Sequence, residues 1–279
     1  MRSWSSSIRP VRRSAGRPLP PILHPATRMT CARGAGDPPG IPHGPGRFGQ
    51  ALWFLLTLGL LAPGFPSADT GQDDGRKVSP HLNAGYLDAD YERWKAVFER
   101  PGRDIFDQRH RILRESGVRT GMQVADIGAG TGLFTLLFAR SVGPEGRVYA
   151  VDISPVFVQN ILRRVEQEQL ANVEGIVNTA KAAGLVAGSI DLAFVCDTYH
   201  HFEYPAAMLR SIAAALRPGG QLVVIDFRRI PGVSRPWILR HVRGGRSEVA
   251  AEIEQAGFEL VASKDFLREN YFLRFRKAE

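Results

Sequence analysis

The segment Val124–Thr135, VADIGAGTGLFT, constrains the fold more strongly than any other part of this chain. An apolar run ends at Asp126, and glycines follow at three alternate positions, Gly128, Gly130 and Gly132, before a second apolar segment begins. Glycine adopts positive φ without a steric penalty and lets a ligand approach the backbone closely. The pattern predicts a buried strand, a tight turn that faces a ligand, and the start of a helix.

The spacing of these glycines separates two kinds of nucleotide-cofactor turn. A dinucleotide fingerprint has the form G-x-G-x-x-G, and its third glycine would fall at Leu133. What remains is D-x-G-x-G-x-G from Asp126 to Gly132. This segment resembles motif I of the class I S-adenosylmethionine-dependent methyltransferases, and the resemblance extends over residues 118–262.

A second acidic residue supports the resemblance. Residues 146–154 read as a strand that ends at Asp152, where a carboxylate can accept both hydroxyls of a ribose. The resemblance implies that Asp152 binds the ribose of S-adenosylmethionine and that Asp126 lies near its methionine ammonium group. The cofactor-binding residues expected on this basis are Asp126, Gly128, Ala129, Gly130, Gly132, Asp152, Ile153 and Asp197.

The order of apolar segments predicts an α/β fold, a doubly wound and mostly parallel seven-stranded sheet with a helical segment before it. Two helices are expected first, over 90–100 and 104–116, with Asp90 and Asp104 as N-caps. Glycines and a proline at 216–220 predict a turn before the fifth strand. The expected strands are 122–127, 147–152, 173–177, 190–196, 221–227, 258–264 and 270–276, and the helices between them are 133–141, 155–169, 205–216 and 247–256.

The chain divides into four parts by composition. Residues 1–50 are rich in Pro, Gly, Arg and Ser and are expected to be a disordered leader, 51–64 is a hydrophobic, signal-like segment, 65–117 holds a linker and the first helices, and 118–279 is the methyltransferase domain. The apolar run 51–62 is too short to span a bilayer but suits the hydrophobic core of a secretory signal, with a cleavage site at 62–64.

The leader leaves the location of the protein open. A long stretch before 51–62 is unusual for a signal, and Met29 is an alternative start. We expect an exported or periplasmic protein, or one anchored in the membrane through 51–62. Targeting to an organelle or a cytoplasmic location are the alternatives, since an Arg- and Ser-rich leader also resembles a transit peptide.

The excess positive charge belongs to the leader. The chain has a formal net charge of +8, but residues 1–64 contain eight arginines, no lysine and one acid, so the remainder is nearly neutral. We therefore expect no nucleic-acid partner. The only cysteines, Cys31 and Cys196, exclude a disulfide framework and a four-thiolate zinc site, and Cys196 is expected in the core.

The fourth expected strand ends in a polar loop, Asp197 to His201. Its place at the carboxyl end of a parallel strand directs it toward the cofactor. His200 and His201 are the candidate catalytic residues, because a histidine suits the role of general base if the acceptor must lose a proton; packing or helix capping is the alternative for either. We expect no metal site from His200, His201 and Asp226, since adjacent histidines seldom bind one ion.

Two further segments are candidates for the acceptor side. Tyr86, Phe106, Arg109 and His110 lie in the N-terminal segment that often covers the acceptor pocket in methyltransferases. The stretch 228–245, which contains His241 and Arg243, either closes over the substrate or is a solvated surface loop.

One position departs from the family pattern. After the third strand these methyltransferases usually carry an acid that accepts a hydrogen bond from the adenine amino group, whereas Lys181 stands near that place here. A lysine cannot accept a hydrogen bond. Asn178, Thr179 or the backbone would have to hold the adenine instead.

We therefore expect an enzyme that transfers a methyl group from S-adenosylmethionine to a small-molecule acceptor, because no substrate-recognition domain or basic groove is evident. Two alternatives stay open: a degenerate domain that binds without transfer, and a methyltransferase that acts on a protein or lipid at the membrane. The acceptor and the oligomeric state cannot be read from these residues.

Overall fold

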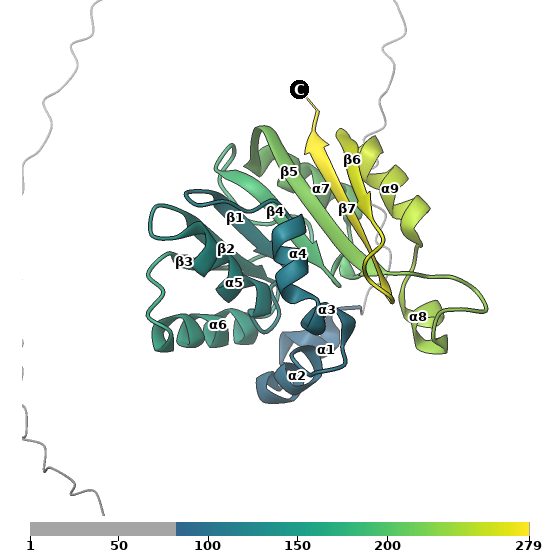
Figure 1. The fold of residues 1–279 in the computed structure, drawn as a ribbon, viewed down its shortest axis with the longest axis horizontal. Coiled ribbons are helices and arrows are strands. Elements are labelled where there is room, and N and C mark those ends of the chain that lie inside the picture. The colour runs from purple at the N-terminus through teal and green to yellow at the C-terminus, as the bar shows by residue number, and fades with distance from the viewer. Residues whose placement is uncertain (1–81, 279) are drawn as a thin grey trace, which may run out of the picture. The chain divides into compact units, whose positions relative to one another are not determined.

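The computed structural model describes residues 82–278, which belong to the second of two compact units, Ser67–Glu279. They form a seven-stranded sheet in the order β3-β2-β1-β4-β5-β7-β6 (Figure 1). β7 is antiparallel to β5 and β6, and the other neighbouring pairs are parallel. The strands are β1 (Gln123–Ile127), β2 (Arg147–Asp152), β3 (Val173–Val177), β4 (Ile190–Cys196), β5 (Leu216–Phe227), β6 (Phe258–Lys264) and β7 (Asn270–Lys277).

The predicted fold class is confirmed by this sheet. Nine α-helices and one 3-10 helix accompany the sheet within residues 82–278. The helices are α1 (Ala84–Leu87), α2 (Tyr91–Phe98), α3 (Asp104–Asp107), α4 (Arg109–Glu115), α5 (Leu133–Val142), α6 (Pro155–Gln167), the 3-10 helix η1 (Tyr199–His201), α7 (Pro205–Ala215), α8 (Pro236–His241) and α9 (Arg246–Gln255). The predictions for the leader 1–50, the segment 51–64 and Cys31 fall outside the described residues.

The central strands are apolar along most of their length because both faces of the sheet are covered. On β4, Phe194 packs into a core with the aromatic side chains of α5, while its neighbour Val195 packs into a core with α7 and α9. Successive side chains of a strand point to opposite faces, so one continuous apolar run supplies both cores. No helix within residues 82–278 is long and apolar enough to cross a membrane.

The topology places a crevice at one edge of the sheet. β1 has β2 on one side and β4 on the other, so the loops that leave β1 and β4 depart in opposite directions and separate at the carboxyl ends of these strands. Helices α1, α2, α3 and α8 lie at this same end of the sheet (Figure 1). The N-terminal helices and α8, which are far apart in the sequence, therefore line one cavity with the glycine turn.

The first helices differ in part from the prediction. Asp90 caps α2 as expected, since its carboxylate accepts from the Arg93 backbone N–H at 3.1 Å. The segment expected as one helix is divided into α3 and α4, and the prediction that Asp104 is an N-cap is wrong. The buried Asp104 carboxylate instead accepts from the backbone N–H groups of Arg268 and Glu269, at 2.5 and 3.2 Å. Its role is to tie α3 to the segment before β7.

The region between β4 and α9 also differs. β5 begins at Leu216, within the segment expected to be a turn, and its pairing with β4 shifts register between Ile190 and Leu192. The stretch 228–245 contains helix α8, which the sequence did not predict. Pro236 stands at its first turn, where a missing N–H is harmless.

Candidate active site

A cavity of about 670 Å³ lies at the carboxyl ends of β1, β2 and β4. This volume is in the range of pockets that enclose a small organic ligand. Its lining comes from the glycine turn, the ends of β2 and β4, the N-terminal helices and α8. Of the predicted site residues it is lined by Asp126, Gly128, Ala129, Gly130, Asp152, Ile153, Asp197, His200 and His201.

The glycine turn is shaped by the protein's own packing as well as by the cavity. Gly128 has φ +72°, and a Cβ there would lie 2.1 Å from the Thr198 methyl carbon. Gly130 has φ +55° and an open Cβ position whose nearest neighbour is the Phe98 ring at 3.6 Å. Gly132, predicted to bind the cofactor, is not among the lining residues, and a Cβ there would meet Ile161 at 2.9 Å. Gly128 and Gly130 both line the cavity, and of the two only Gly130 has an open Cβ position.

Asp152 joins the glycine turn to the end of β2. One of its oxygens accepts from the Gly130 N–H at 2.8 Å and the other from the Ser154 N–H at 2.8 Å. Burial raises the pKa of Asp152 to about 6, against the effect of these backbone donors. A carboxylate has about four acceptor sites, so capacity remains for two ribose hydroxyls on the cavity side. This arrangement fits the predicted role.

Asp126 provides a second buried carboxylate on the same wall. It accepts from the Thr135 hydroxyl at 2.6 Å, and burial raises its pKa to about 7, with a further contribution from the charge of Asp152. A carboxylate so raised would be stabilised in its ionised form by a bound cation. The wall formed by Asp126 and Asp152 is therefore suited to a ligand that carries both an ammonium group and hydroxyls.

Asp197 lines the cavity, but its carboxylate already has two partners. Arg103 and Asn270 donate to its two oxygens, each at 2.5 Å. Burial raises the pKa of Asp197 to about 6, while the Arg103 guanidinium acts in the opposite direction. The residue has φ +49°, a strained conformation for a non-glycine residue. These contacts fix the start of the loop that carries the histidines.

His200 is held by a carboxylate on the neighbouring strand. Its Nδ1 lies 2.7 Å from one Asp226 oxygen, and its backbone N–H donates to the other at 2.9 Å. Burial acts to lower the pKa of His200, but the Asp226 carboxylate outweighs it and the net shift is upward. Asp226 thus fixes the ring orientation and leaves Nε2 as the nitrogen without this partner.

A second histidine pair adjoins the first. The Nε2 atoms of His201 and His241 are 3.3 Å apart, and the ring of His200 lies 4.2 Å from that of His201, measured between centroids. Burial lowers the pKa of His201 to about 3, with the neighbouring histidines acting in the same direction. From the sequence, the role of the loop that contains His241 was undecided. In the structure, His241 is the last residue of α8 and lines the cavity.

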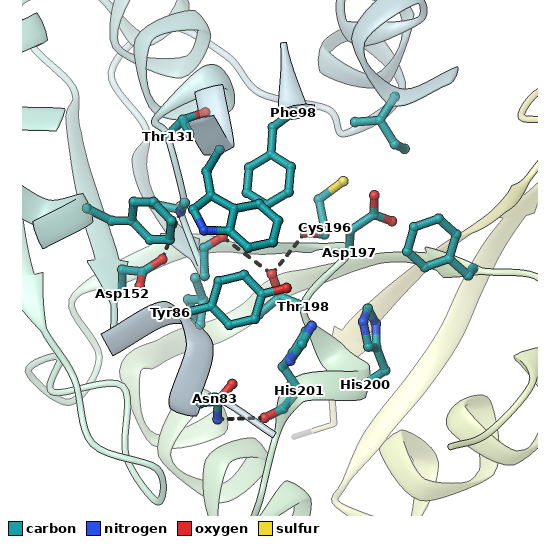
Figure 2. Close-up of a pocket in the computed structure, with 18 of the residues that line it drawn as sticks. Asn83, Tyr86, Phe98, Thr131, Asp152, Cys196, Asp197, Thr198, His200 and His201 are labelled. Carbon is teal, nitrogen blue, oxygen red and sulfur yellow. Dashed lines mark hydrogen bonds between the residues drawn. The ribbon is translucent and has the colours of Figure 1, made fainter. Parts of the chain in front are cut away.

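Aromatic side chains from α1 and α2 cover the cavity between the glycine turn and the histidines. The ring of Trp94 lies 5.1 Å from Phe98 and 4.9 Å from Tyr86, and Tyr86 meets His201 edge-on at 5.1 Å. Asn83 from the same segment donates to the His201 carbonyl at 3.1 Å (Figure 2). The N-terminal segment therefore closes one side of the site, as predicted for Tyr86.

The end of α2 is fastened to the glycine turn. Glu99 accepts from the Thr131 hydroxyl at 2.7 Å and from the Arg164 guanidinium at 2.6 Å, and Arg164 also donates to the Thr131 carbonyl at 2.8 Å. Both members of the ion pair are largely buried. The aromatic cover is thus held by α6 and by the turn itself.

Several residues considered from the sequence lie elsewhere. Phe106, Arg109 and His110 do not line the cavity, and the Arg109 guanidinium stacks over the Phe106 ring at 4.2 Å. Arg243 pairs with Glu252 at 2.6 Å, away from the lining. The loop 228–245 nevertheless closes over the site, through Arg235, Trp237, Arg240 and His241.

Lys181 does not line the cavity. The Lys181 ammonium lies 4.7 Å from the centre of the Tyr204 ring, whereas Asn178 and Thr179 face the cavity. Asn178 uses its amide N–H on the Thr179 carbonyl at 2.8 Å, which leaves its amide oxygen as an acceptor. The sequence named both residues as substitutes for the usual acid, and their place in the lining agrees.

Together, the sheet order and a glycine turn between two buried carboxylates define a class of protein. The fold and the site resemble those of the class I S-adenosylmethionine-dependent methyltransferases. Residues 124–220 match a family described as "Methyltransferase domain". The predicted family and its cofactor, S-adenosylmethionine, are confirmed at this level.

Similar proteins carry methyltransferase names. The chain is 36% identical over 131 residues to a ubiquinone/menaquinone biosynthesis C-methyltransferase from Pasteurella multocida, which covers 43% of this chain and 47% of the relative. It is 26% identical over 140 residues to a demethylmenaquinone methyltransferase from Lactococcus lactis, 50% of this chain and 55% of the relative. The chain therefore spans about half the length of the curated relatives it matches.

The fold also resembles solved structures. A SAM-dependent methyltransferase from Aquifex aeolicus superposes with a TM-score of 0.60 at 24% identity, over 67% of this chain and 98% of that protein. At this identity the likeness concerns the fold alone.

Proposed function

We propose that this protein transfers the methyl group of S-adenosylmethionine to a small-molecule acceptor. The observation that carries the proposal is the continuity of the cavity, which runs from the Asp126–Asp152 wall to the histidines of the β4 loop. One cavity can therefore hold a cofactor and an acceptor together, as an in-line displacement requires.

The residues on the cofactor side are assigned from their geometry. Asp152 would accept the ribose hydroxyls, Asp126 would face the ammonium group, and Gly130 would allow close contact with the backbone. The oxygen of Asn178 would accept from the adenine amino group. When bound, S-adenosylmethionine supplies an electrophilic methyl group on a sulfonium sulfur, and the chain's task is to align an acceptor with it.

The acceptor side favours a flat, largely apolar molecule. Trp237 packs edge-on against Phe227 at 5.0 Å and lies 6.1 Å from His241, and Tyr86 meets His201 edge-on in the same cavity. Aromatic walls bind planar rings through offset or edge-to-face contacts. The relatives named for ubiquinone and menaquinone biosynthesis agree with this choice, and a hydroquinone or phenol is the acceptor class that we propose.

His200 is proposed to act on the acceptor's proton. Asp226 holds its Nδ1 side and supports the ring from behind, as in other catalytic pairs in which a carboxylate orients a histidine. His201, the second predicted catalytic residue, lies beside it and faces His241. These roles agree with the placement of both rings in the lining.

The test is a transfer assay with the full-length chain. Labelled S-adenosylmethionine is incubated with a panel of hydroquinones, phenols and aliphatic amines, and release of S-adenosylhomocysteine and the labelled product are measured. We expect label in a planar aromatic acceptor. Cofactor binding without release for any acceptor would overturn catalysis and favour the degenerate binding domain, and label in membrane protein or lipid alone would favour the third alternative.

We also propose that the chain is exported. The support is the apolar run 51–62, followed by small residues at 62–64. Cell fractionation with N-terminal sequencing of the mature protein tests this. A mature chain that begins near residue 65 and lies outside the cytoplasmic fraction is expected, and an intact leader in that fraction would contradict export.

A further inference from the structure

Three histidines from two separate segments converge at the acceptor end of the cavity. One nitrogen from each of His200, His201 and His241 lies within 4.8 Å of the other two. His200 and His201 come from η1 after β4, and His241 is the last residue of α8. All three line the cavity. Imidazole is a ligand for zinc and related divalent transition metals.

The spacing within the cluster matches a metal ion for one pair. A tetrahedral zinc ion with Zn–N bonds of about 2.05 Å separates its ligands by about 3.3 Å. The Nε2 atoms of His201 and His241 are 3.3 Å apart. The three nitrogens lie up to 4.8 Å apart, about 1.5 Å more than tetrahedral zinc requires, so a ring must move; His241 belongs to a six-residue helix within a loop, the kind of segment that moves most readily.

The surroundings of His200 resemble those of a metal ligand. A ligating histidine usually gives its second ring nitrogen to a carboxylate, which fixes the ring and raises its basicity. The Asp226 carboxylate holds Nδ1 of His200 at 2.7 Å and also accepts two backbone N–H groups, from His200 and Phe227. His200 therefore presents Nε2 in a fixed orientation.

The charge around the cluster also suits a cation. Asp197 is paired with Arg103, and Glu252 with Arg243, so these carboxylates are already compensated by arginines. The charge balance of Asp226 rests on His200 instead. Arg240 also lines the cavity and would oppose a cation, whereas the buried Asp226 carboxylate behind His200 would favour one.

We propose that His200, His201 and His241 bind one divalent transition-metal ion of the zinc class, with Asp226 orienting His200 and a fourth coordination position open to the cavity. Three protein ligands with an open position are the arrangement of catalytic zinc sites. The role of this position rests on the proposed function: the metal would hold the oxygen of the acceptor and lower the pKa of its O–H, whose proton would pass to solvent water, and His200 would then serve as a ligand in place of a base.

The experiment is metal titration of the full-length chain without a polyhistidine tag. The protein is stripped with a chelator and titrated with Zn²⁺ against a chromophoric competitor, and with Co²⁺, whose visible absorption reports four-coordinate geometry. The variant is His241→Ala, and the matched control is His110→Ala, an exposed histidine outside the cavity. Because the leader also contains His and Cys, the site is read from the difference between the chains.

We expect one tight equivalent in the wild type and in His110→Ala, a loss of at least about 100-fold in affinity in His241→Ala, and a loss of about 10- to 100-fold in Asp226→Asn. Circular dichroism checks that each variant is folded, and His241→Gln replaces a variant that is not. Equal Zn²⁺ affinity in the wild type and a folded His241 variant would overturn the metal site.

A parallel titration with S-adenosylhomocysteine separates this proposal from the proposed function. Metal binding without S-adenosylhomocysteine binding would contradict the proposed function and leave the metal site standing. The reverse result would overturn the metal site alone.

Discussion

At the scale of single residues, Gly128 shows that a motif glycine can be required by the protein itself. Its Cβ position is occupied by Thr198, and its φ is positive. Gly121 offers a matched control, because it has φ +82° but no atom within 4 Å of the place where a Cβ would lie. The two positions separate backbone strain from steric overlap.

We predict that Gly128→Ala lowers the free energy of unfolding by about 2 to 4 kcal/mol and that Gly121→Ala lowers it by only about 1 kcal/mol. The first substitution carries both strain and overlap, and the second carries strain alone. Chemical denaturation of the two variants measures both values. Equal losses would show that Thr198 yields freely and that the turn is set by backbone conformation only.

Asp126 gives a prediction with a defined dependence on pH. Its pKa in the folded protein is raised to about 7 by burial, above the ordinary value of about 3.9 in an unfolded chain. Such a group stabilises the fold fully below the unfolded pKa, and this contribution is lost as pH rises through the folded pKa. Asparagine stays neutral, so it avoids that loss and can still accept from Thr135.

We therefore predict that the stabilisation of Asp126→Asn relative to the wild type, measured as the free energy of unfolding, is greater at pH 8.5 than at pH 5 by about 1 to 3 kcal/mol. The comparison is made by denaturation without cofactor at both pH values. A difference that does not change with pH would contradict the proposed protonation. The same variant should bind S-adenosylhomocysteine more weakly, because the ammonium loses its carboxylate.

The residues of the cofactor side could be predicted because they lie within one short motif and the next strand end. Asp126, Gly130 and Asp152 are determined locally by their place at strand ends. The position of His241 in the site could not be predicted in this way, because it depends on how an eighteen-residue loop folds at the end of the sheet. Its only signal was a histidine in a loop after the fifth strand.

At the scale of elements, helix α2 carries the aromatic cover and is fastened at its end by Glu99. Trp94 lies between Tyr86 and Phe98 in this cover. We predict that Trp94→Ala weakens S-adenosylhomocysteine binding by about 10-fold, because a ring pair contributes about 0.5 to 1.5 kcal/mol beyond its buried area. Calorimetry measures the effect, and Arg93→Ala on the exposed face of α2 is the control. An unchanged affinity in Trp94→Ala would place the cover away from the cofactor.

Strands were easier to predict than the small helices. β2, β3 and β4 have the bounds expected from the sequence, because each is a short apolar run that ends in polar or turn residues. α3 and α4 were expected as one helix with Asp104 as its N-cap. The Asp104 carboxylate instead accepts from the backbone N–H groups of residues 268 and 269. A contact across more than 160 residues leaves no local trace in the sequence.

At the scale of the whole molecule, the order of strands and helices was sufficient to predict a mostly parallel seven-stranded sheet. The order of the elements does not predict the acceptor. The walls of the proposed acceptor site come from α1, α2 and the 228–245 loop, which pack together only in the folded state.

The most direct test of the central claim, a cofactor site between the glycine turn and Asp152, is calorimetric titration of the full-length chain with S-adenosylhomocysteine. Asp152 holds Gly130 and Ser154 and would accept the ribose hydroxyls, so Asp152→Ala should weaken binding at least about 100-fold. Glu145→Ala, an exposed acid just before β2, should bind like the wild type. Wild-type affinity in Asp152→Ala, or no binding by the wild type, would contradict the account.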